Sequence, residues 1–271
     1  MRTRCFEARA AAACALLALC VLAAGGCSRK SGPAPSEQAP PPLREWPQGR
    51  AAAVKITDQL LLSIPLQFVR SAIDPRAPAS SPASFAHKEA HFAFFLPDFS
   101  GYTLANYRNE FDENKVEVVY LHAGDPHEAE PDAPGEYPPN MLRRLLKDQL
   151  NPDDYRDMYG LRCYKGRMLT DRLICYGRRD ESRGEDIMLT TLVPPYAEGV
   201  TFPQMQARYF SRRFGGVRIA WRTHVRNLPR WREIDEQIWQ HIEAWNVAPA
   251  AGPGAAPQAA QPPAPDTAKP R

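Results

Sequence analysis

The sequence lacks the short motifs that identify the common nucleotide-binding, zinc-dependent and dithiol enzymes. It contains no glycine-rich phosphate-binding loop, no H-E-x-x-H pair of zinc ligands and no C-x-x-C motif. Ser100, in Phe99-Ser100-Gly101, lacks the glycine two residues earlier that a nucleophile elbow requires. The sequence therefore predicts a protein that is not an enzyme. A hydrolase that uses Ser100 or Asp98 in an unfamiliar arrangement is the alternative that these absences leave open.

The chain also has little excess charge of either sign. Its formal net charge is +3, but residues 1–26 contain three arginines and one glutamate, so the remainder has a net charge of +1. Non-specific binding to nucleic acid requires many clustered contacts with phosphates. A nearly neutral chain does not supply these contacts globally, so we do not expect nucleic acid as a partner.

Metal-binding patterns are missing as well. His87 and His91 are four residues apart, but they lead into the apolar run of residues 92–95, which we expect to be extended. In a strand these histidines would lie roughly 13 Å apart, too far for one metal ion. The acidic stretch of residues 151–154 is predicted to be a turn and a helix N-cap, since it lacks the alternating ligands of a calcium loop. No metal and no cofactor are predicted.

The N-terminal segment is typical of an exported protein. Three arginines in residues 1–9 precede 15 apolar residues, 10–24, and then Gly25-Gly26-Cys27. As a helix, 15 residues span roughly 22 Å, less than the roughly 30 Å of a bilayer core, so a membrane-spanning anchor is the weaker interpretation. An ordinary secretion signal is the other alternative.

Residues 22–27, LAAGGC, resemble the lipobox of bacterial lipoproteins. The resemblance implies that residues 1–26 are removed and that Cys27 becomes a lipidated N-terminus. It also implies a periplasmic protein held at a membrane, and Ser28 after the cysteine implies the outer membrane. Residues 27–50, rich in proline and serine, are predicted to be a tether. Residues 248–271 are predicted to be a disordered tail rich in alanine and proline.

The remaining residues, 51–247, are predicted to form a single α+β domain with a largely antiparallel sheet. We expect strands at 92–96, 116–121, 187–193 and 217–225 and in a hairpin around the two remaining cysteines, and helices at 141–150, 203–214 and 229–246. The last helix is the clearest, because its large apolar residues share one face. These residues are Trp231, Ile234, Ile238, Ile242 and Trp245. We expect this helix to pack on the core; an exposed partner-binding helix is the alternative.

Two cysteines, Cys163 and Cys175, remain in the folded region after processing. They lie in two strand-like runs that flank a predicted turn centred on Leu169. Opposite residues of an antiparallel hairpin have a constant index sum, so the two cysteines face each other on one side of the hairpin. In an oxidising compartment this arrangement predicts a structural disulfide.

Charge is unevenly placed along the chain. Eight arginines and no acid occur from residue 208 to residue 232, whereas nine acids and one lysine occur from 110 to 136. Within the predicted strand at 217–225, the apolar side chains alternate with a cationic stripe, which contains Arg218, Arg222, His224 and Arg226. This stripe could bind an acidic protein surface or lipid head groups. The alternative is a solvated face whose arginines pair with Glu117 and other acids of the first half.

These features together favour a tethered protein-binding module. The layout of lipobox, Pro-rich tether and compact α+β domain resembles the immunity lipoproteins that protect the periplasm against lipase effectors of type VI secretion. The resemblance implies that the protein would neutralise a toxin by occlusion, and it transfers no site residue. A structural lipoprotein of envelope or secretion-apparatus assembly is the second hypothesis, and a lipid or cell-wall hydrolase is the third.

Overall fold

The computed structural model describes residues 49–73, 88–167 and 171–249. The predicted signal 1–26, the lipidation site Cys27, nearly all of the tether 27–50 and nearly all of the tail 248–271 lie outside these residues, as does His87. Within the described ranges, no helix is both long enough and apolar enough to cross a membrane.

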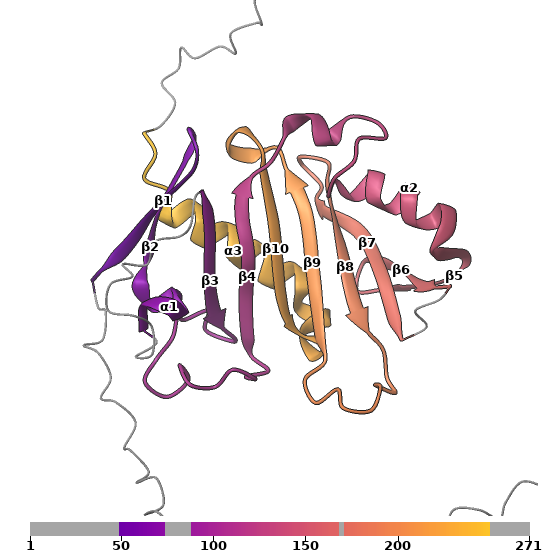
Figure 1. The fold of residues 1–271 in the computed structure, drawn as a ribbon, viewed down its shortest axis with the longest axis horizontal. Coiled ribbons are helices and arrows are strands. Elements are labelled where there is room, and N and C mark those ends of the chain that lie inside the picture. The colour runs from indigo at the N-terminus through magenta and orange to yellow at the C-terminus, as the bar shows by residue number, and fades with distance from the viewer. Residues whose placement is uncertain (1–48, 74–87, 168–170, 250–271) are drawn as a thin grey trace, which may run out of the picture. The chain divides into compact units, whose positions relative to one another are not determined.

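The domain is built on one eight-stranded antiparallel sheet with the strand order β3-β4-β10-β9-β8-β7-β6-β5 (Figure 1). A separate hairpin is formed by β1 and β2. The predicted α+β class and antiparallel sheet are confirmed. The strands are β1 (Ala51–Thr57), β2 (Leu60–Pro65), β3 (Glu89–Phe95), β4 (Lys115–Ala123), β5 (Leu150–Met158), β6 (Leu161–Gly166), β7 (Arg172–Asp180), β8 (Glu185–Leu192), β9 (Gln204–Ser211) and β10 (Val217–His224).

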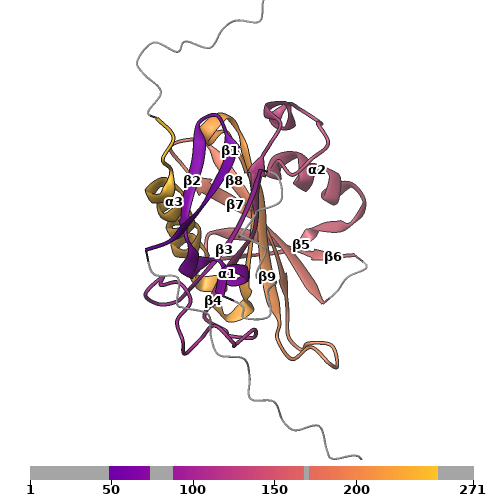
Figure 2. The same ribbon diagram turned by 60° about the vertical axis from the view of Figure 1, so that its left-hand side comes forward.

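Within the described residues the α-helices are α1 (Arg70–Ile73), α2 (Pro138–Asp148) and α3 (Trp231–Trp245). The helix α3 and the β1–β2 hairpin cover one face of the sheet, whereas α2 lies on the other face, as Figure 2 shows. The core lies under α3, where its apolar stripe packs on the alternate residues of the strands that face it. The prediction that this C-terminal helix packs on the sheet is confirmed.

Two predictions of local structure are wrong. Residues 203–214, expected to be a helix, contain strand β9, in which Met205, Ala207 and Tyr209 are buried while the residues between them are less so. This alternation has the period of a strand. Residues 151–154, expected to be a turn and an N-cap, belong to β5, which pairs only with β6 at the edge of the sheet. The β1–β2 hairpin was not predicted.

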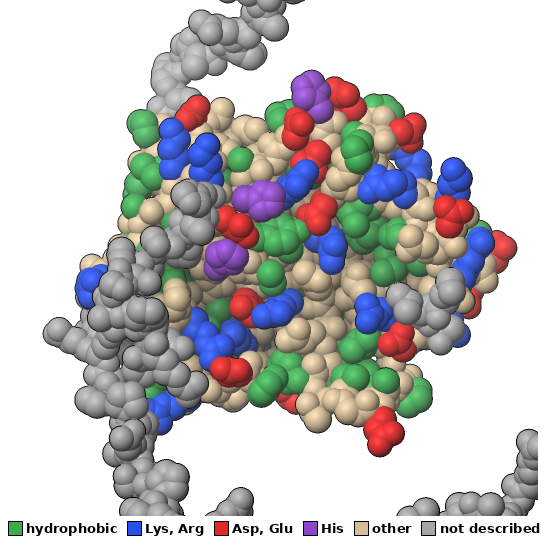
Figure 3. All heavy atoms as spheres, in the orientation of Figure 1, with side chains coloured by type: hydrophobic (Ala, Val, Ile, Leu, Met, Phe, Trp, Pro, Cys, Tyr) green, Lys and Arg blue, Asp and Glu red, His purple; other side chains and the backbone are tan. Residues whose placement is uncertain are grey.

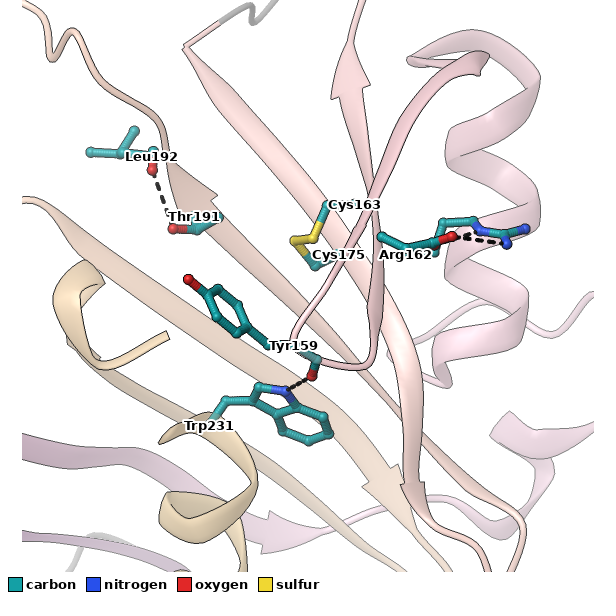
Figure 4. Close-up of a disulfide and its surroundings, with 8 residues drawn as sticks. Tyr159, Arg162, Cys163, Cys175, Thr191, Leu192 and Trp231 are labelled. Carbon is teal, nitrogen blue, oxygen red and sulfur yellow. Dashed lines mark hydrogen bonds and ion pairs between the residues drawn. A yellow bond between two sulfur atoms is a disulfide. The ribbon is translucent and has the colours of Figure 1, made fainter. Parts of the chain in front are cut away.

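The cysteine hairpin has the predicted register. Cys163 of β6 is paired with Cys175 of β7, and a disulfide joins their fully buried sulfur atoms (Figure 4). Nearby, the indole Nε1–H of Trp231 donates to the carbonyl oxygen of Tyr159 at 2.9 Å. This bond fixes the start of α3 against the turn between β5 and β6.

A buried polar network joins α3 to the sheet. Asp235 of α3 accepts hydrogen bonds from Tyr209 Oη at 2.6 Å and Trp221 Nε1 at 3.1 Å. It also forms an ion pair with Arg179 of β7 at 3.2 Å, and Arg179 pairs with buried Glu185 as well. Burial raises the pKa of Asp235, and the guanidinium of Arg179 opposes that rise. Each charge has a partner of opposite sign, which offsets much of the desolvation penalty of burying it. The network therefore fixes the orientation of α3 on the sheet.

Candidate functional site

The face of the sheet opposite α3 is only partly covered, and we call it the open face. One row of side chains crosses it at matching register positions: Thr190 of β8, Gln206 of β9, Arg222 of β10 and Glu117 of β4. Their neighbours along each strand point into the core because side chains alternate. Figure 3 shows basic and acidic side chains interleaved over the middle of this face. The open face therefore presents polar groups that the core does not use.

A hollow of about 960 Å³ lies on the open face, and we call it the groove. Strands β7 to β10 form its floor, the C-terminal end of α2 forms one wall, and Phe202 from the β8–β9 loop also lines it. The groove combines apolar side chains with amide, hydroxyl and guanidinium groups. Its described lining residues include Leu145, Asp148, Arg172, Ile174, Thr190, Leu192, Phe202, Gln204, Gln206, Arg208 and Arg222.

A second, smaller hollow of about 240 Å³ adjoins the groove, because Phe202, Gln204 and Arg222 line both. Its other wall comes from the β3–β4 loop and from Lys115 of β4. The ammonium group of Lys115 lies 3.7 Å from Glu117, and burial lowers the pKa of this lysine. Arg222 therefore lies at the junction of two hollows.

The structure separates the members of the predicted cationic stripe. Arg218 Nε donates to Glu128 at 2.6 Å, and the side chain of Glu128 is only 4% exposed. Glu128 also closes the capping box of the 3-10 helix Pro126–Ala129. Arg222 forms an ion pair of 2.8 Å with Glu117. Arg218 thus holds a loop in place, whereas Arg222 lies in the groove.

His224 and Arg226 lie at the end of β10, and neither lines the groove. Arg226 forms an ion pair with Glu113, and its backbone N–H donates to His224 Nδ1 at 3.2 Å. The ring of Phe202 lies 5.0 Å from that of His224, and burial lowers the pKa of this histidine. The pairing of the arginine-rich strand with acids of residues 110–136, which the sequence left as an alternative, is present at all three arginines of the stripe.

An apolar rim that the sequence did not reveal lies beside the hollows. Phe111 in the β3–β4 loop is 66% exposed. Phe111 contacts Phe202 of the β8–β9 loop with ring centroids 5.6 Å apart. We call Phe111 and Phe202 the apolar rim, because both line the smaller hollow and Phe202 lines the groove as well. Phe111 and Phe202 lie in irregular loops between strands, where apolar residues follow no helical or strand period, so no periodic pattern marked them.

The residues weighed for catalysis have local roles. Asp98 Oδ1 accepts from the hydroxyl of Ser100 at 3.0 Å and from its N–H at 3.4 Å, which is a turn cap. His91 lies 3.4 Å from Glu89 of the same strand. In the part of the chain that the structure describes, no group of three or more His, Cys, Asp or Glu side chains is placed to hold a metal ion.

Comparison with known proteins gives one distant structural likeness. Neither a protein-family model nor a curated protein matches the chain. Among solved structures, the chain is similar to an immunity protein of the Stenotrophomonas maltophilia type IV secretion system. The similarity covers 72% of this chain and 93% of that chain, with 12% sequence identity and a TM-score of 0.48. A similarity at this level is too weak to carry a function from one protein to the other.

Proposed function

We propose that this protein is a partner-binding module of the bacterial cell envelope. It holds another protein against the open face and blocks that protein by occlusion, as an immunity protein blocks its toxin. The groove with its apolar rim is the observation that supports this proposal most directly. Occlusion needs a complementary surface and no catalytic group, which agrees with the local roles of Ser100 and Asp98.

The rim supplies the kind of contact that dominates binding energy at protein interfaces. Hot spots are enriched in aromatic side chains and arginine, and they cluster where water is excluded. The groove brings such groups together, because Phe202 and Arg222 line both hollows and Phe111 packs against Phe202. A partner that buries Phe111 would remove a largely exposed aromatic side chain from water.

The polar floor supplies the specificity of such an interface. Thr190, Gln204 and Gln206 present hydroxyl and amide groups to the groove. A partner that leaves these groups unpaired pays their desolvation, whereas a complementary partner satisfies them. Mixed apolar and polar composition is typical of non-obligate interfaces.

The tether and the lipid attached at Cys27 are part of the same proposal. They would keep the domain at the membrane surface, where a toxin that enters the periplasm would meet it. Replacement of Cys27 by Ser should abolish fatty-acid labelling, because serine has no thiol to carry the acyl glycerol. A Cys27→Ser protein that is still labelled would contradict the anchor at Cys27 without affecting the proposal for the groove.

Photocrosslinking in the native cells tests the binding proposal. A benzophenone amino acid replaces Gln206 in the groove or Phe111 on the rim, and Glu236 or Gln240 on the exposed side of α3 serves as the control. We expect one protein to be captured from the first two positions and not from the controls. Capture from α3 alone would refute the use of the open face. Capture of several subunits of one membrane complex would instead support a role in assembly.

A further inference from the structure

We infer that the groove receives an acidic segment of the partner; this inference rests on the proposed function and specifies the chemistry of the contact. Arg172, Arg208 and Arg222 line the groove, and Asp148 is the only acid among its described lining residues. The excess of positive charge belongs to the groove itself, because the protein as a whole is nearly neutral. A cleft with charges of one sign attracts groups of the opposite sign.

The carboxylates that pair with these arginines lie outside the groove. Arg172 is 4.0 Å from Asp171, and Arg208 is 3.7 Å from Glu136. Both distances exceed that of a normal hydrogen bond, so the attraction is electrostatic and the geometry is loose. None of Asp171, Glu136 and Glu117, the partner of Arg222, lines the groove.

Each guanidinium group has five N–H donors in a planar fork, and one carboxylate occupies two of them at most. Arg208 uses Nη2 to donate to Gln206 at 3.1 Å, in addition to its long ion pair. Arg222 directs Nε and Nη2 to one oxygen of Glu117. The arginines therefore retain N–H groups for a further carboxylate, and Gln206 and Thr190 between them add neutral donors.

The spacing of the arginines favours a peptide segment. Arg172 is on β7 and Arg222 is on β10, three strands apart, which corresponds to about 14 Å across the sheet. An extended segment advances about 3.3 Å per residue, so two carboxylates about four residues apart match this span. A fatty acid has a single carboxylate and would engage one arginine. The geometry therefore favours an acidic peptide over a fatty acid.

Fluorescence anisotropy with defined probes tests this inference. The full-length mature protein is titrated with a labelled peptide of six Glu-Ala repeats, with Gln-Ala and Lys-Ala peptides of equal length, and with oleate. We expect the acidic peptide to bind more tightly than the neutral and basic peptides, and its affinity to fall as salt is raised. Its binding should shift the amide resonances of Thr190 and Gln206 in the NMR spectrum.

Three triple variants locate the effect. Arg172→Glu, Arg208→Glu and Arg222→Glu together should weaken binding of the acidic peptide at least tenfold, and the corresponding triple change to Gln should weaken it less. The control changes Arg162, Arg183 and Arg230 to Glu and should alter affinity less than twofold. The side chains of the groove arginines are 49%, 36% and 43% exposed, and those of the control arginines 49%, 52% and 36%. All six are ion-paired.

Several results would overturn the inference. One is that the folded protein does not bind the acidic peptide. Another is that the groove and control triple glutamate variants lose equal affinity for the peptide. The third is that oleate binding depends on the groove arginines whereas peptide binding does not. Circular dichroism and urea unfolding establish that each variant is folded. A neutral or basic segment captured from position 206 by photocrosslinking would refute the acidic segment and leave the proposed function standing. No capture from position 206 or from position 111 would refute both.

Discussion

His241 provides a pH-dependent test of how α3 is attached to the rest of the domain. Its ring stacks on Trp245 with centroids 4.7 Å apart, and it lies 5.1 Å from the ring of Phe68 and 5.3 Å from that of Phe94. Burial lowers the pKa of His241 to about 4. The cluster thus accepts a neutral imidazole and disfavours an imidazolium.

The sign of the effect follows from proton linkage. The unfolded chain has a histidine pKa near 6.5, so between pH 6.5 and about 4 it binds a proton that the folded protein does not bind. The stability contributed by neutral His241 is fully present above pH 6.5 and is lost as the pH falls toward 4. At about 1.4 kcal/mol per pH unit, the largest possible loss of stability between pH 6.5 and about 4 is about 3 kcal/mol. Because the side chain of His241 is partly exposed, we expect an actual loss of stability of about 1–2 kcal/mol.

Urea unfolding of the wild type and of His241→Phe at pH 7.0 and pH 4.5 measures this loss. Phenylalanine fills a similar volume and has no proton to bind, so the free energy of unfolding of the variant should fall by about 1–2 kcal/mol less than that of the wild type. Carboxylates such as Glu233, whose pKa is lowered by Arg230, titrate in both proteins and cancel in the difference. Parallel losses in the two proteins would refute the reasoning.

Three further predictions concern packing and pairing, and each is measured as the free energy of unfolding in urea. Asp235→Ala should lower the free energy of unfolding by about 4 kcal/mol, because Tyr209, Trp221 and Arg179 lose a buried partner. Asp235→Asn should lower it by about half as much, and equal losses in the two variants would contradict the network. Arg218→Ala should lower the free energy of unfolding by about 2 kcal/mol, because buried Glu128 loses its partner. Arg222→Ala should lower it by less than about 1 kcal/mol, because the pair with Glu117 is more exposed. The reverse order would contradict the roles assigned to the two arginines. Replacement of Cys163 and Cys175 by Ala should cost about 3 kcal/mol, and an unchanged stability would show that the crosslink constrains little.

Local periodicity was sufficient to predict several elements. The spacing of apolar residues identified α3, the index sum gave the register of Cys163 and Cys175, and alternation distinguished the two faces of β10. Each of these features depends on residues close together in the chain. The same approach failed for β9, where Pro203 at a plausible helix start and several good helix-forming residues outweighed a short alternation.

The groove could not be predicted, because it depends on the order of strands that are distant in the sequence. Arg172 and Arg222 line the same hollow only because β8 and β9 lie between β7 and β10. Likewise, the sequence contained a block of arginines and a block of acids, but the specific pairing of Arg218 with Glu128 depends on how the loop after β4 folds back. Spacing along the chain carries no information on such contacts.

The central claim is that the partner binds in the groove of the open face. It is tested most directly by the affinity of the captured partner for a variant in which a large side chain fills the groove. Replacement of Gln206 by Trp places a large side chain on the floor of the groove, and replacement of Glu236 by Trp makes the same change on the exposed side of α3. We predict that Gln206→Trp weakens binding at least a hundredfold, whereas Glu236→Trp changes it less than twofold. Equal affinities of the two folded variants would contradict binding through the open face.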